Sequence, residues 1–565
     1  MTAAALSRAE HLARLVAAPV DVLVIGGGIT GAGVALDAAS RGYSVGLVDQ
    51  ADFASGTSSR STKLIHGGIR YLAKGQVQLV REALHERTVL LRLAPWLVRP
   101  QLFLIPLYAH LRQPLGLVVP ALLRSLAPIG IGIGLWAYDR FARNAALAHR
   151  RISAGEVAQL APALITDGLQ MAFLYYDARA DDVRLTHAVL RSARRYGALT
   201  VNHARVCAFI RQQGRVSGVQ VEDGLTGRSY DIGARQVVNA TGVWSEQVAG
   251  LDSPPPFRVK PSRGTHLVLR KESVTAQTSL VIPETDDGRL LFLTPWAGRL
   301  LLGTTDEPYT GTLDAPRASA GEIRYLLDHA NRYLSPPIEP SAIVGVFAGL
   351  RPLVVSRDAE SKALSREHVV VTSPSGLIHI LGGKLTSYRK MAADTVDEIT
   401  RRLGDRRDSR TATLALDGTD GWEETRRVVA ASGLSTEEQA HIVEAYGSGA
   451  AQLLELVKHS GDLRVPLAPQ HLVLAAEVVH ACRVEMCVSL ADFMIVRSRL
   501  SVVADDAGAL AVDRVSALMT EELRWDTAER TRQRETWEGL VARDRSALGE
   551  VQHALASSRP PCRAS

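Results

Sequence analysis

The chain has 565 residues, a formal net charge of +6 at pH 7 and 46% hydrophobic residues. This length predicts two or three domains, and the ordinary balance of hydrophobic and charged residues excludes a largely disordered protein. The mild positive charge suits an anionic substrate or an acidic membrane surface, while no basic run interleaved with aromatic residues favours nucleic acid.

The four cysteines lack the spacing of a zinc site or a disulfide framework, so we expect no metal site and a reducing compartment. The first twenty residues lack the apolar core of a signal peptide, and we predict that they form a short helix. We therefore expect a cytoplasmic protein.

The first predicted unit is a nucleotide-binding strand, turn, helix and strand. The apolar run Val22–Ile25 leads into Gly26, Gly28 and Gly31, which have the Gly-x-Gly-x-x-Gly spacing. Such glycines allow a tight turn, a close backbone approach to a pyrophosphate and close helix packing. The helix N-terminus then faces the phosphates, and Asp49 is placed to accept hydrogen bonds from a ribose. A bound dinucleotide is the expectation.

The segment Leu115–Trp136 is almost wholly apolar and long enough to cross a bilayer. Arg124 near its middle, two prolines and four glycines argue against a spanning helix. Flanking arginines, together with Trp136 and Tyr138, suit a membrane–water interface. We expect monotopic contact with a membrane, with a buried hairpin, an oligomer contact or a true span as alternatives.

The remaining elements follow from periodicity. Helices are predicted at Gln76–Arg92 and Val183–Gly197, and Ile152–Ala204 as a whole is expected to be helix and connection. Strand-like alternation covers Arg205–Val238, and short apolar runs divided by Pro and Gly at Leu267–Leu302 predict an antiparallel sheet.

The polar stretch Leu403–Asp417 predicts a domain boundary. Helical patterning follows from Trp422, and the tail Ser557–Ser565 is expected to be loose. The C-terminal part is therefore predicted to be a separate helical domain.

Three further segments favour a flavin over a nicotinamide. Asp52–Tyr71 gathers hydroxyl and basic side chains between glycines, which can line a phosphate and a polar ring system. Ala240–Trp244 follows a strand and exposes backbone donors. Leu381–Lys390 places glycines at a strand-to-helix junction, where a helix N-terminus can face charge on an isoalloxazine ring.

These segments in this order resemble the FAD-dependent glycerol-3-phosphate dehydrogenase family, and the resemblance covers nearly the whole chain. The most specific matches are Ser58–Tyr71, Asp181–Arg184, Gly303–Asp306, Leu350–Pro352 and Gly382–Arg389.

The resemblance implies an α/β fold, α+β overall. It comprises a glutathione-reductase-like, FAD-binding Rossmann domain interleaved with an antiparallel β substrate cap, and a C-terminal α-helical domain. The FAD and cap parts together are expected over residues 1–403 and the helical domain over 404–565. The FAD parts are expected at about 18–100, 150–255 and 340–403, and the cap at about 101–149 and 256–339.

The implied reaction moves a hydride from C2 of glycerol 3-phosphate to flavin N5, giving dihydroxyacetone phosphate, and passes the electrons to a membrane quinone. The implied protein is a homodimer on the inner face of the cell membrane. Such a site needs cations for the phosphate and a group to take the hydroxyl proton. The resemblance assigns substrate contacts to Arg70, Tyr71, Arg351 and Lys384, and His266 is the first choice as base.

The predicted cofactor-binding residues come from these motifs and include the three turn glycines. They are Gly26, Gly28, Gly31, Asp49, Thr57, Ser58, Ser59, Lys63, His66, Gly67, Val206, Ala240, Thr241, Gly242, Gly349, Gly382, Gly383, Lys384, Leu385 and Thr386. The C-terminal stretch Ala491–Leu500 departs from the family pattern, because Val496 replaces one arginine of a pair.

Three alternatives differ in class. A soluble glycerol-3-phosphate oxidase would share the site but pass electrons to oxygen, and the apolar segment Leu115–Trp136 argues against it. An amine or amino-acid oxidase of the same fold needs a carboxylate-binding arginine without the full phosphate-binding set. A flavin-binding membrane scaffold would tolerate the loss of Arg351, Lys384 or His266, and all three are present.

Overall fold

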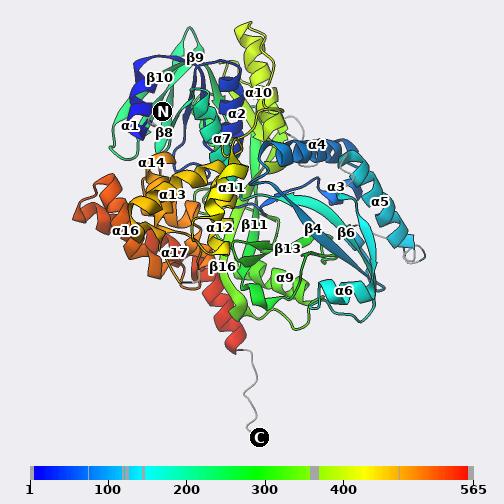
Figure 1. Cartoon of the computed structure of the whole chain (residues 1–565). Coiled ribbons are helices and arrows are strands. Elements are labelled where there is room, and N and C mark those ends of the chain that lie inside the picture. The colour runs from blue at the N-terminus through cyan, green and yellow to red at the C-terminus, as the bar shows by residue number, and fades with distance from the viewer. Residues whose placement is uncertain are drawn as a thin grey trace.

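The computed structural model describes residues 6–557 except 74, 117–119, 121, 123–125, 143–146, 357–367 and 470. Arg124 and all but the first residue of the tail Ser557–Ser565 lie outside the described residues. The described chain forms two β-sheets with helices on their faces and a helical C-terminal region, coloured yellow to red in Figure 1. This architecture confirms the predicted fold class.

The first sheet grows from the predicted strand, turn, helix and strand. β1 (Val20–Ile25) pairs in parallel with β2 (Val45–Val48) and β10 (Ser229–Asn239), and α2 (Ile29–Ser40) connects β1 to β2. The strand order is β17-β18-β10-β1-β2-β7, and β8 and β9 extend from β10. The other strands are β7 (Leu199–Val201), β8 (Ala204–Gln212), β9 (Arg215–Asp223), β17 (His368–Thr372) and β18 (Ile378–Gly382).

The two faces of this sheet have separate cores because successive side chains of β1 point to opposite faces. On one face Val22 and Val24 pack with α2, α7 (Asp182–Arg195) and α10 (Tyr388–Leu403). α2 and α10 approach closely, since a Cβ at Gly33 would lie 2.9 Å from the Tyr388 ring. On the other face β1 packs with α1 (Arg8–Ala17). The helix predicted near Val183–Gly197 is confirmed as α7.

The second sheet has ten strands in the order β15-β11-β14-β13-β12-β4-β6-β3, with β16 beside β11 and β5 beside β6. All its pairings are antiparallel except that of β4 with β12. The predicted antiparallel runs at Leu267–Leu302 are confirmed. The strands are β3 (Leu64–Ile65), β4 (Arg99–Tyr108), β5 (Arg150–Ser153), β6 (Leu169–Arg179), β11 (Phe257–Leu269), β12 (Ser279–Ile282), β13 (Leu291–Trp296), β14 (Arg299–Gly303), β15 (Glu307–Pro308) and β16 (Ile343–Ser356).

Four strands within the expected FAD parts belong to this second sheet, namely the short strands β3 and β5 and the long strands β6 and β16. β6 was expected to be helix and connection, but it is an 11-residue strand along β4. Its aromatic run Phe173–Tyr176 favours a strand, and contacts with β4, about 70 residues earlier in the chain, decide the outcome. β16 pairs with β11 over nearly its whole length, because the two strands bury a shared apolar face.

Helices around the second sheet include the predicted helix Gln76–Arg92, which is α4 (Val77–Leu93). The apolar segment Leu115–Trp136 contains the start of α5 (Ala127–Ala142), at the edge of the molecule in Figure 1. Among the described residues, no helix has both the length and the apolar character needed to cross a membrane. The remaining helices here are α3 (Ile69–Ala73), α6 (Ala154–Leu160), α8 (Ser245–Gly250) and α9 (Ala320–Asn331).

The helical C-terminal region begins after α10, which ends at Gly404 in a left-handed conformation with φ of 71°. Its apolar cores are formed mainly by its own helices, as expected for a separate domain. The helices are α11 (Trp422–Ala430), α12 (Thr436–Tyr446), α13 (Ala450–His459), α14 (Ala475–Val484), α15 (Leu500–Val503), α16 (Ala509–Leu523) and α17 (Thr527–Ser557).

Buried ion pairs join this domain to the first sheet. Arg497 bridges Asp52 and Glu485, and all three side chains are almost fully buried. Arg184 of α7 also contacts Glu485, at 3.0 Å. We call this set the docking seam, which comprises Asp52, Lys63, Asp182, Arg184, His203, Glu485, Asp492, Arg497 and Arg499.

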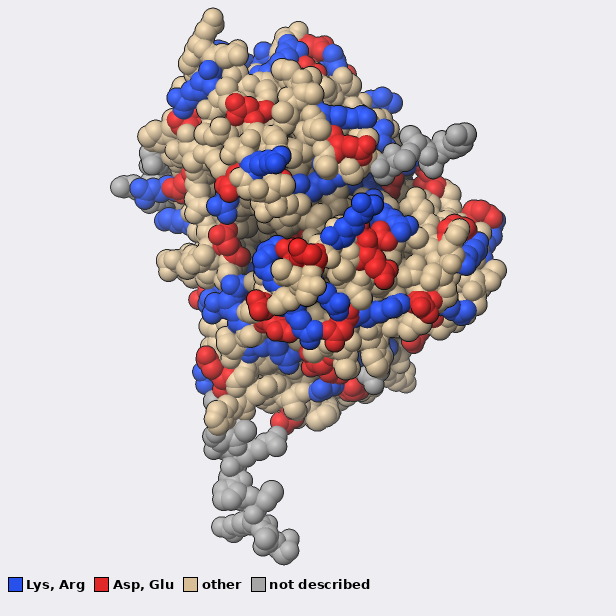
Figure 2. Space-filling view, turned by 90° about the vertical axis from the view of Figure 1, so that its left-hand side faces the viewer, with Lys and Arg blue, Asp and Glu red and all other residues tan. Residues whose placement is uncertain are grey.

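The residue that departs from the family pattern fits this seam. Val496 packs with Ala54 and Val183 in a small apolar cluster. An apolar contact therefore stands where the family often has an arginine. Outside the seam, on the face that carries the C-terminal helices, Figure 2 shows acidic and basic side chains interspersed rather than gathered by sign.

Candidate active site

The glycine turn between β1 and α2 leaves no space for side chains. Gly26 has φ of +108°, and a Cβ there would lie 2.7 Å from the Ala240 carbonyl oxygen. A Cβ at Gly31 would lie 1.8 Å from the Gly26 carbonyl oxygen. Gly28 precedes the first residue of α2, whose N-terminal amides can face a phosphate. The turn therefore has the geometry that a pyrophosphate requires.

Asp49 directly follows β2 and is hydrogen-bonded to the turn. Its carboxylate accepts hydrogen bonds from the amides of Gly27 at 2.5 Å and Ala51 at 2.9 Å. Burial is the largest influence on this group and raises the pKa of Asp49 to about 6. The carboxylate thus shapes the turn, and its contact with a ribose stays a prediction.

The hydroxyl loop forms the helical turn η1 (Thr57–Ser59), which links the two sheets. The Ser58 hydroxyl accepts from the amide of Ile29 at 2.9 Å and so caps α2. Thr57 donates to the Leu350 carbonyl of β16 at 2.6 Å, and Ser59 donates to carbonyls within its own loop. A Cβ at Gly349 would lie 2.7 Å from the Arg60 carbonyl oxygen, so β16 also approaches this loop closely.

Lys63 lies in the docking seam. Its ammonium donates to the Asp182 carboxylate at 2.6 Å and to the Ser59 carbonyl at 2.7 Å. Arg499 contacts the same carboxylate at 2.9 Å. Burial first, and then the Arg499 charge, lower the pKa of Lys63 to about 8. The ammonium therefore already bonds to Asp182 and Ser59. We expect it to act on a cofactor by holding the Ser59 loop in place.

The loop after β3 meets the glycine pair after β18. The His66 amide donates to the Thr386 hydroxyl at 3.0 Å, and the Gly67 amide donates to the Tyr138 hydroxyl of α5 at 2.9 Å. Gly383 has φ of +83°, and a Cβ there would lie 2.3 Å from the Met391 sulfur. Gly382 is also left-handed, with φ of +72°. These glycines let the chain turn sharply just before Lys384 and Leu385.

The end of β10 supplies the other predicted cofactor contacts. The Ala240 amide donates to the Ile25 carbonyl at 2.9 Å, which places Thr241 beside the glycine turn. Gly242 has φ of +59° and open space where a Cβ would be. Val206 is buried in β8 opposite Val221, in the same apolar cluster as Ile25 and Val48, and its contact with a cofactor stays a prediction. The structure thus gathers the predicted residues of β1, β10 and the hydroxyl loop, with Val206 in the antiparallel extension of the sheet.

His266 and Arg351 lie on the neighbouring strands β11 and β16. The His266 Nε2 lies 2.9 Å from the Thr62 hydroxyl, and the imidazole stacks on Phe347 with ring centres 4.9 Å apart. Burial, followed by the charges of Arg351 and Lys63, holds the pKa of His266 well below its ordinary value. The imidazole is therefore neutral, and its buried Nδ1 makes no hydrogen bond within the described part of the chain.

Arg351 crosses over Gly264, where a Cβ would lie 2.5 Å from its guanidinium. It donates to the Thr305 carbonyl at 3.1 Å, to Asp306 at 3.2 Å and to the Thr304 hydroxyl at 3.2 Å. A quarter of the side chain remains exposed. The guanidinium is thus held in place while part of it stays accessible.

Lys384 and Tyr71 form a second group, with the ammonium 4.1 Å from the ring centre. Arg70 precedes Tyr71 in α3, and its Nε lies 3.8 Å from the position of a Cβ at Gly116. A chain of close neighbours leads from this group to His266. A Cβ at Gly68 would touch both Tyr71 and His66. The centre of the His66 ring lies 6.5 Å from that of the Phe292 ring. Phe292 and His266 lie on the two strands that flank β14, and both pair with its residue Gly303.

The sequence reasoning missed several residues that position this site. Thr62 and Phe347 hold the His266 ring, and Asp182 holds Lys63. The motif Asp181–Arg184 resembles the family, but nothing in it indicates that Asp182 meets Arg499 of the C-terminal domain.

The arrangement fits FAD. The glycine turn forms a cradle that any Cβ would fill, the α2 N-terminus faces it, and the ends of β2 and β10 flank it. The residues that would hold the cofactor are those of the turn, η1 and the Ala240–Gly242 strand end. His266, Arg351 and Lys384 then lie on the side of the second sheet and the glycine pair, where a substrate can meet the cofactor.

Comparisons with known proteins agree with this geometry. A family model described as "FAD dependent oxidoreductase" matches residues 21–389, and one described as "C-terminal domain of alpha-glycerophosphate oxidase" matches residues 409–530. Mitochondrial glycerol-3-phosphate dehydrogenase of Homo sapiens is 36% identical over 545 residues, which cover 91% of this chain and 72% of the relative. Glycerol-3-phosphate dehydrogenase 2 of Mycobacterium tuberculosis is 35% identical over 530 residues, covering 92% and 88%.

A solved structure extends the similarity to three dimensions. The glycerol-3-phosphate dehydrogenase from Bacillus halodurans, complexed with FAD, has a TM-score of 0.76 and 29% sequence identity. The match covers 94% of this chain and 97% of that one. The cofactor of the present protein is FAD, and the chain belongs to the FAD-dependent glycerol-3-phosphate dehydrogenase family.

Proposed function

We propose that this protein oxidises sn-glycerol 3-phosphate to dihydroxyacetone phosphate and passes the electrons to a membrane quinone. The observation that carries the proposal is the pairing of a neutral, buried imidazole with a held guanidinium on adjacent strands, His266 and Arg351. FAD, when bound, supplies the acceptor for the C2 hydride. The chain's own residues then bind the phosphate and take the hydroxyl proton.

The phosphate-binding role belongs to the cations. Arg351 can donate to phosphate oxygens with the exposed part of its guanidinium, and Lys384 and Arg70 add charge from the other side of the site. Tyr71 positions the Lys384 ammonium through its ring face. An anionic substrate is thereby favoured over the neutral or cationic substrates of an amine oxidase.

The proton-accepting role belongs to His266. When its Nε2–H donates to the Thr62 hydroxyl, the Nδ1 atom carries the lone pair that can take the C2 hydroxyl proton. The low pKa keeps the ring uncharged and ready to accept. Phe347 holds the ring plane by stacking, so the nitrogen lone pair keeps one direction.

An anaerobic spectrum tests this function. The purified holoenzyme is mixed with glycerol 3-phosphate, and bleaching of the flavin bands is followed before and after addition of a ubiquinone analogue. Bleaching that recovers with quinone supports the dehydrogenase. A flavin that stays oxidised would overturn the substrate assignment, and recovery with oxygen but not with quinone would favour the oxidase.

Membrane contact is proposed for α5 and for Leu122 before it. Ile129, Ile133 and Trp136 follow helical spacing along one face and are 60%, 63% and 63% exposed, while Leu122 is 94% exposed. An exposed apolar face beside Arg140 suits an interfacial position on an anionic membrane. We propose that the protein binds the cytoplasmic face of the membrane through this surface and acts as a homodimer.

Vesicle sedimentation tests the membrane contact. Ile133→Asp should abolish co-sedimentation with anionic vesicles while the glycerol 3-phosphate half-reaction persists. Leu225→Asp, on the turn between β9 and β10, replaces a residue that is 48% exposed and serves as the matched control. Equal vesicle binding by both variants would exclude α5 as the contact.

A further inference from the structure

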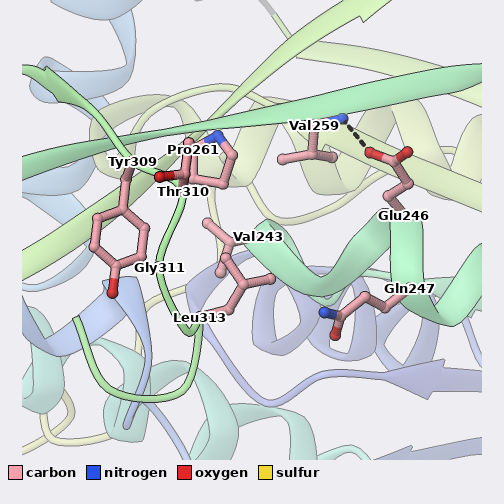
Figure 3. A pocket seen from close by; sticks show the side chains of 9 residues that line it. All are labelled: Val243, Glu246, Gln247, Val259, Pro261, Tyr309, Thr310, Gly311 and Leu313. Carbon is pink, nitrogen blue, oxygen red and sulfur yellow. Dashed lines mark hydrogen bonds between the residues drawn. The ribbon is translucent and has the colours of Figure 1, made fainter.

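A cavity of about 340 Å³ lies where the two sheets meet. One wall is the short helical turn η5 (Gly242–Trp244) with α8, and the other is β11 with the loop after β15 (Figure 3). Val243, Val259, Pro261 and Leu313 form its apolar lining, and Tyr309 and Gln247 lie at its edge. Its volume falls at the lower end of the range for small-molecule sites.

The first wall is continuous with the FAD site. Val243 directly follows Thr241 and Gly242, which come just after β10 and are predicted to contact the cofactor. The ring of Trp244 lies 3.1 Å from the position of a Cβ at Gly56, immediately before the hydroxyl loop. A ligand in the cavity would therefore sit next to the cofactor-binding turn.

The second wall is continuous with the substrate strands. Pro261 pairs with Pro352, the neighbour of Arg351, and the Tyr309 amide donates to the Pro261 carbonyl at 3.0 Å. The Trp244 indole donates to Asp314 at 2.7 Å, which fixes the loop that carries Leu313 against the cofactor side. The cavity is thus close to both half-sites without including His266 or Arg351.

The chemistry of the lining selects the class of ligand. Glu246 is the only charged side chain among the described residues that line the cavity, and its carboxylate accepts from the Val259 amide at 2.8 Å. A negative charge there disfavours a phosphate ester, so the cavity is unsuited to the substrate. Apolar walls beside an aromatic ring suit a flat, uncharged ligand, and the Gln247 amide can donate to a carbonyl oxygen.

We propose that this cavity receives the ring of the quinone that reoxidises the enzyme. The inference rests on the proposed function, specifically on its quinone-accepting half. The quinone gains two electrons and two protons, equal in number to those removed from glycerol 3-phosphate, and leaves as the quinol. Substrate and quinone thereby use separate sites, with the quinone cavity where the two sheets meet.

The test fills the cavity without touching the substrate groups. Leu313→Trp and Gln247→Trp are compared with Leu251→Trp, a 45% exposed leucine directly after α8 that does not line the cavity. Flavin in each holoenzyme is reduced with stoichiometric dithionite, and its reoxidation by decylubiquinone is followed by stopped flow. Chemical reduction makes this assay independent of the substrate, and bleaching by glycerol 3-phosphate is measured separately.

We expect both cavity variants to lose at least tenfold in the second-order rate of reoxidation, while Leu251→Trp keeps the parent rate. Calorimetric titration with a hydroxyquinoline N-oxide, a quinone analogue, should show binding to the parent and Leu251→Trp but not to Leu313→Trp. Parent-like reoxidation in both cavity variants would overturn the proposal, as would a parent that decylubiquinone does not reoxidise. Failure of glycerol 3-phosphate to bleach the parent flavin would instead contradict the proposed function.

Discussion

The glycine turn and the docking seam both surround buried polar groups, but they do so by opposite means. In the turn, Asp49 accepts backbone amides from residues within 22 positions of it, and close backbone contacts exclude side chains. In the seam, Arg497 meets Asp52 across 445 positions, and opposite charges compensate one another. The turn is therefore sensitive to added volume, whereas the seam is sensitive to loss of a partner and to pH.

The largest effect is expected from added volume in the turn. Gly31→Ala should yield protein without bound FAD and without activity, because the new Cβ would lie 1.8 Å from the Gly26 carbonyl oxygen. Flavin absorbance of the purified protein measures the result. Gly130→Ala in α5, where a Cβ meets nothing within 4 Å, is the control and should gain up to about 1 kcal/mol of stability. A flavin-loaded Gly31→Ala variant would contradict this account of the turn.

The next largest loss of activity is expected at the substrate site. Like the docking seam, this site is formed by segments that are far apart in the sequence. Arg351→Ala should lower kcat/KM for glycerol 3-phosphate by about 100- to 1000-fold, since a charged contact to the phosphate is lost. FAD content should stay at the parent level, as measured by absorbance. Arg258→Ala, an exposed arginine on the adjacent strand β11, is the matched control. Near-parent turnover of Arg351→Ala would remove this residue from the substrate site.

The same contrast explains what the sequence could predict. The spacing of Gly26 and Gly31 encodes local geometry, so the turn, its helix and the strand ending at Asp49 follow from a short stretch of chain. Lys63 is predicted to contact the cofactor, which stays a prediction, and the structure adds a bond from its ammonium to Asp182, 119 positions away. The local sequence around neither residue indicates that pairing, because it depends on the pairing of β3 with β6, which brings the start of α7 beside Lys63.

Long-range pairing also explains the misassigned strand. The aromatic run of β6 favours a strand, and the pairing of β6 with β4 decides the outcome. The arrangement of His266 and Arg351 has the same origin, since β11 and β16 meet although more than 70 residues intervene between them. Family motifs identified both side chains, while their placement beside Thr62 and Thr304 required the fold.

Loss of one partner should weaken the docking seam. Arg497→Ala leaves the buried carboxylates of Asp52 and Glu485 without their shared cation, and such a loss costs about 3–5 kcal/mol. Urea unfolding followed by circular dichroism measures the change. Arg483→Ala breaks an exposed pair with Glu522 and should cost about 1 kcal/mol or less. Similar losses in the two variants would mean that burial does not set the strength of the seam.

The smallest effect, and the one that separates charge from volume, is the pH dependence of the seam. His203 contacts Asp492 at 3.0 Å, and although burial is the largest influence and lowers its pKa, the charges and hydrogen bond of Asp492 together raise it to about 9. The folded pKa thus lies above the ordinary value of 6.5. The pair therefore contributes its full stability below pH 6.5 and loses it as pH rises through 9.

His203→Asn removes the titrating group and keeps a residue suited to the left-handed φ of 48° at this position. Relative to this variant, the parent should lose about 1–3 kcal/mol of unfolding free energy between pH 6.5 and 9, measured by urea unfolding at each pH. Asp49, the titratable group of the glycine turn, has a pKa of about 6 and stays mainly ionised between pH 6.5 and 9, so flavin content at pH 9 should match that at pH 6.5. Parallel stability curves for parent and variant would show that folding leaves the pKa of His203 unchanged, and the seam would then rest on its arginines.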